Sequence, residues 1–319
     1  MNTFGNKFRL TTFGESHGVA VGGIIDGCPS GIRIDFDAVA ADLSRRRGKP
    51  GAGASARALQ ESDQVEWLSG ILDGITLGTP IGFIVRNTAQ QPDDYSNLEH
   101  VFRPGHADLS YLKKYGIRDA RGGGRASARE TVARVVAGSI AKQILAEKGV
   151  SVSAKVSMVA GFGEERADQW EALISEARQD GDSVGGVVEG LISGLKAGIG
   201  DPVFDKLQAM LAYSIMSIPA VKGFEYGEGF REAQMRGSRC NLLRDGISGG
   251  ISTGDDIRFR VAFKPTPSIA REQIMQALEP DGSFTERIVS INGRHDACVA
   301  MRAPVIVESM EALVLVNLI

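Results

Sequence analysis

Apolar residues recur three or four positions apart over residues 128–148, which is the spacing of one buried helix face. Ser127 and Glu130 stand three residues apart at the start of this stretch, as in a capping box. Gly149 follows the last apolar position and is typical of a helix end. The pattern therefore predicts a long helix over residues 128–148.

The same spacing predicts three further helices. Residues 36–47 form an amphipathic stretch directly after Asp35, a residue type that favours the N-cap position. A second stretch opens at Pro202, and Phe204 is the first residue of its apolar face. Residues 305–316 complete the set, although their β-branched residues are less favourable in a helix.

Between the helices, two segments of alternating polarity occur twice. Residues 21–27 (VGGIIDG) recur as residues 184–190 (VGGVVEG), and residues 74–85 recur as residues 250–261, in the same order. Each copy has the pattern of a strand, a turn and a strand. Chance similarity between glycine-rich strands is the alternative to a duplication, and a single repeat at this spacing excludes a solenoid.

Mixed strand pairs and helices indicate an α+β fold in layers. The repeat predicts two similar halves, roughly residues 1–150 and 151–319. No linker of distinct composition separates them. We therefore expect one domain over residues 1–319.

Composition excludes several classes of protein. No apolar run approaches the roughly 18 residues of a membrane span, and the N-terminus lacks the pattern of a secretory signal. The chain has 36 basic and 39 acidic residues, so it has no general attraction for nucleic acid. Cys28, Cys240 and Cys298 have no paired spacing, and no histidine pair has metal-ligand spacing. A cytoplasmic protein without a metal, a membrane anchor or a nucleic-acid partner is expected.

Glycine is unusually frequent, at 40 of 319 residues, and one glycine run stands beside arginines. Residues 121–129 read RGGGRASAR and open the strongest predicted helix. Exposed backbone N–H groups, a positive helix end and flanking arginines favour binding of a phosphate or a carboxylate. Ser127 replaces the third glycine of a dinucleotide-binding motif, and no Walker lysine follows, so neither of those motifs is present.

Three of the four histidines lie in turns that are rich in glycine or arginine. They are His17, His106 and His295. A structural role is the more frequent one for a single histidine, but three in similar turns favour a functional cluster. The KPTPS sequence at residues 264–268 is a rigid polar turn after a strand and could hold a ligand.

Residues 14–18 (GESHG) match the nucleophile elbow of α/β-hydrolases. That motif needs a helix directly after the serine, whereas residues 19–25 have the pattern of a strand. A serine hydrolase is therefore a weak alternative.

Several motifs together resemble the chorismate synthase family from end to end. They are GESHG at residues 14–18, DGCP at 26–29, FRPGHAD at 102–108, GRASARE at 124–130, KPTPS at 264–268, GRHD at 293–296 and ES at 308–309. The resemblance implies a β-α-β sandwich fold and a homotetramer. It also implies the reaction that converts 5-enolpyruvylshikimate 3-phosphate to chorismate and phosphate, the last step of the shikimate pathway, with reduced FMN as cofactor.

The resemblance also implies roles for individual residues. His17, His106 and Asp296 would handle protons, and Asp296 would act together with the flavin N5 to remove the C6 proton. FMN contacts would fall on Arg46, Arg125, Ala126, Ser127, Pro219, Ala220, Gly249, Lys264, Pro265, Thr266, Pro267, Ser268 and Arg294. The substrate's carboxylates and phosphate would be bound by Arg46, Arg103, Arg129 and Arg294.

Two departures from the family pattern leave an alternative open. The family has a second arginine soon after the arginines at 45–47, where this chain has Lys49 and no arginine until Arg57. The loop between Gly237 and Gly249 is also shorter than in the family. The alternative is a non-catalytic flavin- or phosphate-binding relative. Because the chain has no dinucleotide motif, an external flavin reductase is expected, with NADPH acting only as an indirect reductant of the flavin.

Overall fold

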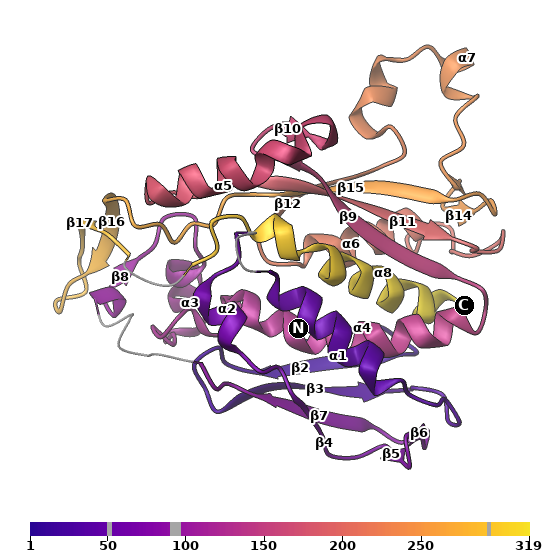
Figure 1. Ribbon diagram of the computed structural model, residues 1–319, viewed down its shortest axis with the longest axis horizontal. Coiled ribbons are helices and arrows are strands. Elements are labelled where there is room, and N and C mark those ends of the chain that lie inside the picture. The colour runs from indigo at the N-terminus through magenta and orange to yellow at the C-terminus, as the bar shows by residue number, and fades with distance from the viewer. Residues whose placement is uncertain (50–52, 90–96, 292–294) are drawn as a thin grey trace.

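The computed structural model describes residues 1–49, 53–89, 97–291 and 295–319, and it shows a layer of helices between two antiparallel sheets (Figure 1). The first sheet has the strand order β1 (Thr3–Phe4), β2 (Arg9–Gly14), β3 (Ala20–Asp26), β7 (Ile81–Arg86), β4 (Val65–Trp67). The second has the order β10 (Phe162–Gly163), β9 (Ser151–Val159), β11 (Gly186–Ser193), β15 (Ile257–Phe263), β12 (Val221–Tyr226). The layer between them contains α1 (Phe36–Arg47), α4 (Thr131–Ala146), α6 (Leu207–Met216) and α8 (Pro304–Leu318).

The repeated segments occupy equivalent places in the two sheets. Residues 21–27 and 184–190 fall on β3 and β11, and the second repeat falls on β7 and β15, the strands that pair with them. Strand β15 shows why the pattern predicts a sheet: every second residue, from Ile257 to Phe263, is buried, and the residues between them are exposed. The α+β fold with two similar halves is confirmed.

Two of the predicted helices begin later in the chain than expected. The helix predicted from residue 128 begins at Thr131, because residues 128–130 form a separate 3₁₀ turn. Ser127 caps that turn by accepting from the Arg129 N–H, whereas the Glu130 carboxylate pairs with Arg134 at 3.0 Å and does not close a capping box. The third helix begins at Leu207, and Phe204, placed on its apolar face by spacing alone, is 89% exposed.

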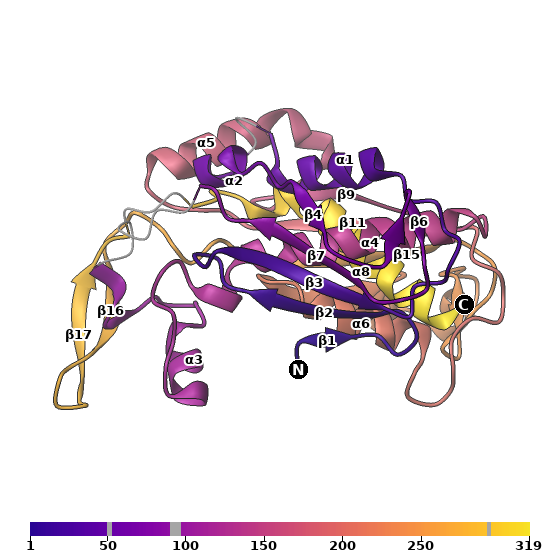
Figure 2. The same cartoon turned by 90° about the horizontal axis from the view of Figure 1, so that it is seen from below.

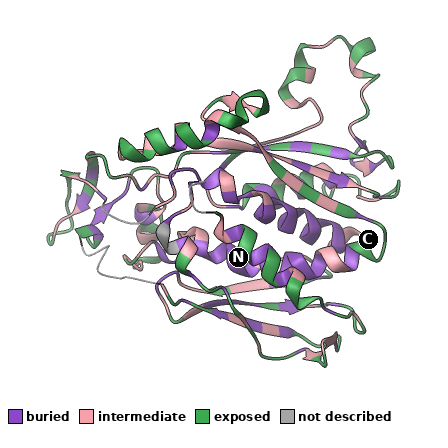
Figure 3. Ribbon diagram, in the orientation of Figure 1, coloured by how far each residue is buried: buried purple, intermediate pink, exposed green. Residues whose placement is uncertain are grey.

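The other two predicted helices are confirmed within a few residues. Asp35 caps α1 by accepting from the Ala38 N–H at 2.9 Å. Helix α8 starts with Pro304 at its first turn, where a missing N–H costs nothing. It is buried on nearly all sides (Figure 3), because α4, α6 and strand β9 surround it.

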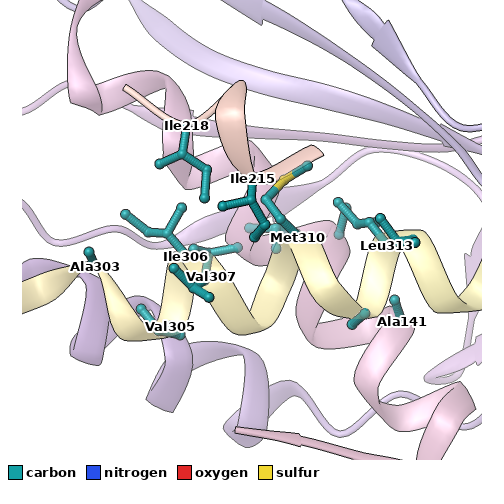
Figure 4. Packing of buried hydrophobic residues seen from close by; sticks show 14 of the residues in the cluster. Ala141, Ile215, Ile218, Ala303, Val305, Ile306, Val307, Met310 and Leu313 are labelled. Atoms are coloured by element: carbon teal, nitrogen blue, oxygen red, sulfur yellow. The ribbon is translucent and has the colours of Figure 1, made fainter. Parts of the chain in front are cut away.

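A continuous hydrophobic core joins the two sheets to the helices. Ile306, Met310 and Leu313 of α8 pack beside Ile215 of α6 and Ala141 of α4 (Figure 4). A second, smaller cluster lies under the three-stranded sheet β17–β16–β8. No helix in the described ranges is long and apolar enough to cross a membrane.

The remaining elements lie around this sandwich, and Figure 2 shows β16, β17 and α3 projecting from one end of it. The strands are β5 (Ile71–Leu72), β6 (Ile75–Thr76), β8 (Val101–Phe102), β13 (Ile247–Ser248), β14 (Ile251–Ser252), β16 (Gln273–Leu278) and β17 (Phe284–Val289). The helices are α2 (Ala56–Gln60), α3 (Asp108–Tyr115), α5 (Trp170–Gln179) and α7 (Gly237–Cys240).

Candidate active site

A cavity of about 660 Å³ lies at the ends of the helical layer where α4 and α8 begin and α1 ends. Its volume falls within the range of about 300–1,000 Å³ that is usual for small-molecule sites. The N-terminal ends of two helices place positive partial charge beside it. The cavity is lined by seven basic side chains and only three carboxylates. The basic residues are Arg46, Arg103, Arg125, Arg129, Arg134, Arg302 and Lys264.

One wall holds two buried arginines on a shared carboxylate. The Arg46 guanidinium donates to Asp63 Oδ2 at 2.6 Å, and Arg129 donates to the other oxygen, Oδ1. Arg129 also donates to Asn87 Oδ1 at 2.9 Å. Burial alone would raise the pKa of Asp63, but the two guanidinium groups outweigh it and lower that pKa. Asp63 is therefore ionised and fixes the direction of both arginines.

Arg46 retains donor capacity on this wall. Its side chain is 2% exposed, and its Nε has no hydrogen-bond partner among the described residues. Burial, with repulsion from Arg129 and Arg302, lowers the pKa of Arg46 to about 10, which still leaves it charged at neutral pH. A buried charged donor without an acceptor is costly unless a ligand supplies one. The wall is thus suited to an anion.

A second wall gathers groups around Asp108. The carboxylate accepts from Arg103 Nε at 2.8 Å and from Arg103 Nη2 at 2.9 Å. Asp108 Oδ1 lies 2.8 Å from His106 Nδ1, and Arg103 Nη1 donates to the Ser268 hydroxyl at 3.1 Å. Burial lowers the pKa of His106, and the charges of Arg103 and Lys264 act in the same direction against the effect of Asp108. His106 is neutral at neutral pH.

A third wall contains Asp296. Its Oδ2 accepts from Arg302 Nη2 at 2.6 Å, and its Oδ1 accepts from the Ser55 N–H at 2.8 Å. Burial would raise the pKa of Asp296, but Arg302 and the Ser55 N–H outweigh it and lower that pKa. An ionised carboxylate therefore faces the cavity.

The glycines at residues 122–124 allow the rings of His17 and His106 to pack directly against the backbone of this segment. Gly122 and Gly123 have φ values of +65° and +96°, which favour glycine. A Cβ at Gly122 would overlap the His17 ring, and one at Gly123 would lie 2.7 Å from His106 Cε1. The run is needed here because backbone packs directly on two imidazole rings.

The cavity brings together most of the residues expected to bind ligands. These are Arg46, Arg103, Arg125, Ala126, Ser127, Arg129, Pro219, Ala220, Lys264, Thr266, Pro267 and Ser268, together with His106 and Asp296. Three expected residues do not line it. His17 is buried behind Gly122, Pro265 lies outside the lining, and Gly249 lies in the turn between β13 and β14. Arg294 lies outside the described residues.

Sequence reasoning missed the carboxylates and the arginine that hold this lining in place. Asp63, Asp108 and Arg302 were not singled out, although Asp108 belongs to the FRPGHAD motif. Only the folded structure marks Asp63 as unusual, because its φ of +49° places a non-glycine residue in the left-handed region. No group of three metal-ligating side chains that could hold an ion occurs among the residues that the structure describes.

Fold and cavity together define the class: an α+β sandwich protein with a cation-lined site suited to a polyanionic small molecule. A family model described as chorismate synthase matches residues 8–319. The chain is 51% identical to the chorismate synthase of Christiangramia forsetii, over 99% of this chain and 96% of that protein. It is 47% identical to that of Azobacteroides pseudotrichonymphae, over 99% and 98%. The chain belongs to the chorismate synthase family.

A solved structure agrees with this assignment. A crystal structure of chorismate synthase matches with a TM-score of 0.75 at 27% sequence identity, covering 99% of this chain and 92% of that one. The β-α-β sandwich expected from the sequence motifs is thereby confirmed.

Proposed function

We propose that this protein catalyses the anti 1,4-elimination of phosphate from 5-enolpyruvylshikimate 3-phosphate to give chorismate, with reduced FMN as cofactor. The observation that carries the proposal is one cavity in which six arginines and Lys264 surround two proton carriers, His106 and Asp296. In the reaction the C3–O bond to phosphate breaks, the C6 proton is lost and a new C=C bond forms, without net oxidation or reduction. The enzyme is a carbon-oxygen lyase of aromatic amino-acid biosynthesis.

The charge of the cavity matches that of the substrate. Two carboxylates and a phosphate carry roughly four negative charges, which arginines can meet with paired hydrogen bonds. Arg46 and Arg129 of the first wall and Arg103 of the second are the proposed substrate-binding residues, and their own carboxylate partners hold them in place before the ligand arrives. Such preorganisation reduces the ordering that binding requires. Arg294 completes the set in the proposal.

The remaining lining fits a flavin nucleotide. Arg125, Ala126 and Ser127 line the cavity close to the start of α4, where the Arg125 guanidinium and the positive helix end suit a phosphate. Pro219 and Ala220 also line the cavity, together with Lys264, Thr266, Pro267 and Ser268. Reduced FMN, when bound, supplies electron density that assists departure of the phosphate.

Two groups of this chain are placed to move protons. Neutral His106 presents an unprotonated ring nitrogen, and ionised Asp296 is a proton acceptor. His17, buried behind the glycine run, is proposed to act beside the departing phosphate. Arg302 and Arg46 then stabilise negative charge that develops on the leaving group.

An anaerobic assay tests the proposal. Purified protein, substrate and chemically reduced FMN should yield chorismate and phosphate in equal amounts. Arg46→Ala should raise KM at least about tenfold, the loss expected for one charge-assisted hydrogen bond. Arg9→Ala, which removes a half-exposed arginine paired with Asp26, is the matched control and should leave KM unchanged. Folded protein that gives no chorismate would refute the proposal.

The same assay tests the non-catalytic alternative and identifies the source of the reduced flavin. Tight FMN binding without turnover would favour a non-catalytic flavin-binding relative. Aerobic protein supplied only with NADPH and oxidised FMN should form no chorismate, because an external reductase is proposed to reduce the flavin. Chorismate under those conditions would show an intrinsic reductase.

The family also supports a proposed homotetramer that works in the cytoplasm. Light scattering during size-exclusion chromatography should give four times the 33.9 kDa chain mass. A monomer at micromolar concentration would contradict the proposed assembly.

A further inference from the structure

Asp108 lies behind the cavity and does not line it, among the residues that the structure describes. Its side chain is 2% exposed and stands in the first turn of α3. Four donors converge on the carboxylate: the Arg103 N–H, Arg103 Nε, Arg103 Nη2 and His106 Nδ1. Arg118 Nη1 adds a second positively charged group at 3.5 Å. One buried carboxylate therefore holds two cavity-lining side chains at once.

The donor set decides which nitrogen of His106 carries the proton. Burial would raise the pKa of Asp108, but His106 and Arg103 outweigh it and hold that pKa far below its usual range. Arg103 Nη2 also lies 3.2 Å from His106 Nδ1, but an ionised carboxylate can only accept hydrogen bonds, so the shorter 2.8 Å contact with Asp108 favours a proton on Nδ1. In a neutral imidazole the other ring nitrogen, Nε2, then keeps its lone pair. The Cε1–Nε2 edge of the ring lies against Gly123, on the glycine run that borders the cavity.

We propose that Asp108 is a positioning residue of the active site, which keeps His106 in the tautomer with a proton on Nδ1 and aligns the Arg103 guanidinium toward Ser268. The inference rests on the proposed function, in which His106 moves a proton. Asp108 acts only through its two partners and needs no contact with substrate or cofactor.

The effect on acidity follows from the groups that face His106. Asp108 raises the pKa of His106, while burial, Arg103 and Lys264 lower it. Removal of the Asp108 charge would therefore lower the pKa of His106 further. The amide of Asp108→Asn keeps the shape of the carboxylate. Its oxygen can accept from Arg103, while its NH₂ group can donate to His106 Nδ1 and so favours a proton on Nε2.

The experiment combines NMR with turnover. In protein labelled with ¹⁵N-histidine, long-range ¹H–¹⁵N spectra distinguish the two tautomers, and a His106→Gln sample assigns the signal. Wild-type protein should show His106 protonated on Nδ1. Asp108→Asn should shift the proton to Nε2, lower the His106 pKa, and reduce kcat by up to about 10⁴, the loss seen when the orienting carboxylate of a catalytic histidine becomes an amide. Asp26→Asn, which removes a half-exposed carboxylate paired with Arg9, is the control and should change none of these.

Two results would overturn the inference. The first is a wild-type His106 protonated on Nε2, a measurement that does not depend on whether the variant folds. The second is a folded Asp108→Asn protein with the wild-type tautomer and wild-type kcat, which would leave Asp108 a purely structural role. Because the wild-type tautomer is read without turnover, a protein that shows the Nδ1 proton but forms no chorismate would refute the proposed function and not the positioning of His106.

Discussion

Replacement of Asp296 by asparagine separates a proton acceptor from a structural cap. The carboxylate and Arg302 are both nearly buried, with side chains 10% and 7% exposed. Asparagine keeps the shape of the side chain and an oxygen that can accept from the Ser55 N–H. It removes only the charge that faces Arg302 and the cavity. Alanine is less useful, because an unpaired buried arginine costs about 3–5 kcal/mol, a large part of a typical unfolding free energy.

The expected magnitudes follow from these contacts. Loss of the charge-assisted bond to Arg302 should lower the free energy of unfolding by about 1–3 kcal/mol. If Asp296 accepts a proton during the reaction, kcat should fall by about 10²–10⁴-fold. The pKa of Asp296 is lowered by folding, so its stabilising effect is present above the unfolded pKa near 4 and is lost as the pH falls through the folded pKa. Acid unfolding of the asparagine variant should lack this contribution.

The assay is anaerobic single-turnover chorismate formation, with urea unfolding measured in parallel. Asp42→Asn is the matched control, because Asp42 is also 10% exposed at its side chain and pairs with Lys142 at 2.6 Å, but it does not line the cavity. It should lose stability and keep kcat. Reduced stability with kcat within twofold of wild type in the Asp296→Asn protein would refute a proton-transfer role and leave a structural cap.

Two further changes test other parts of the fold. Glu311→Leu should raise the free energy of unfolding by about 1–3 kcal/mol, because the carboxyl is fully buried and neither oxygen has a hydrogen-bond partner among the described residues. Burial raises the pKa of Glu311 well above 4.5, so the native state binds more protons than the unfolded state above that pH. The free energy of unfolding of the wild-type protein should therefore fall as the pH rises. In chemical unfolding between pH 5 and 8, the free energy of unfolding of the leucine variant should depend less on pH. Gly122→Ala should lower both kcat and thermal stability, since its Cβ would overlap the His17 ring. Gly149→Ala is the control: this glycine also has a positive φ, of +76°, but its Cβ would meet no other atom. It should cost only about 1–2 kcal/mol of backbone strain and leave kcat unchanged. Equal losses in the two alanine variants would contradict the steric argument.

Local chemistry explains what could be predicted before the fold was known. A strand buried on one face alternates every second residue, so the repeated segments identified β3, β7, β11 and β15 and the two similar halves. A cap is a contact between near neighbours, so Asp35 was recognised from four residues of sequence. Phe204 was misplaced because spacing alone does not show where a helix begins when a turn precedes it.

The sequence by itself therefore determined the layered fold and the family, and most of the residues that it marked as ligand-binding line the cavity. Only the tertiary structure decided how those residues are charged and directed. Asp296 meets a Ser55 N–H that is 241 positions away, and Arg129 meets Asp63 at a separation of 66. Such pairs depend on how the helices and loops pack, and burial amplifies their electrostatic effect. The ionised Asp296, the clamped Arg46 and the neutral His106 follow from that packing.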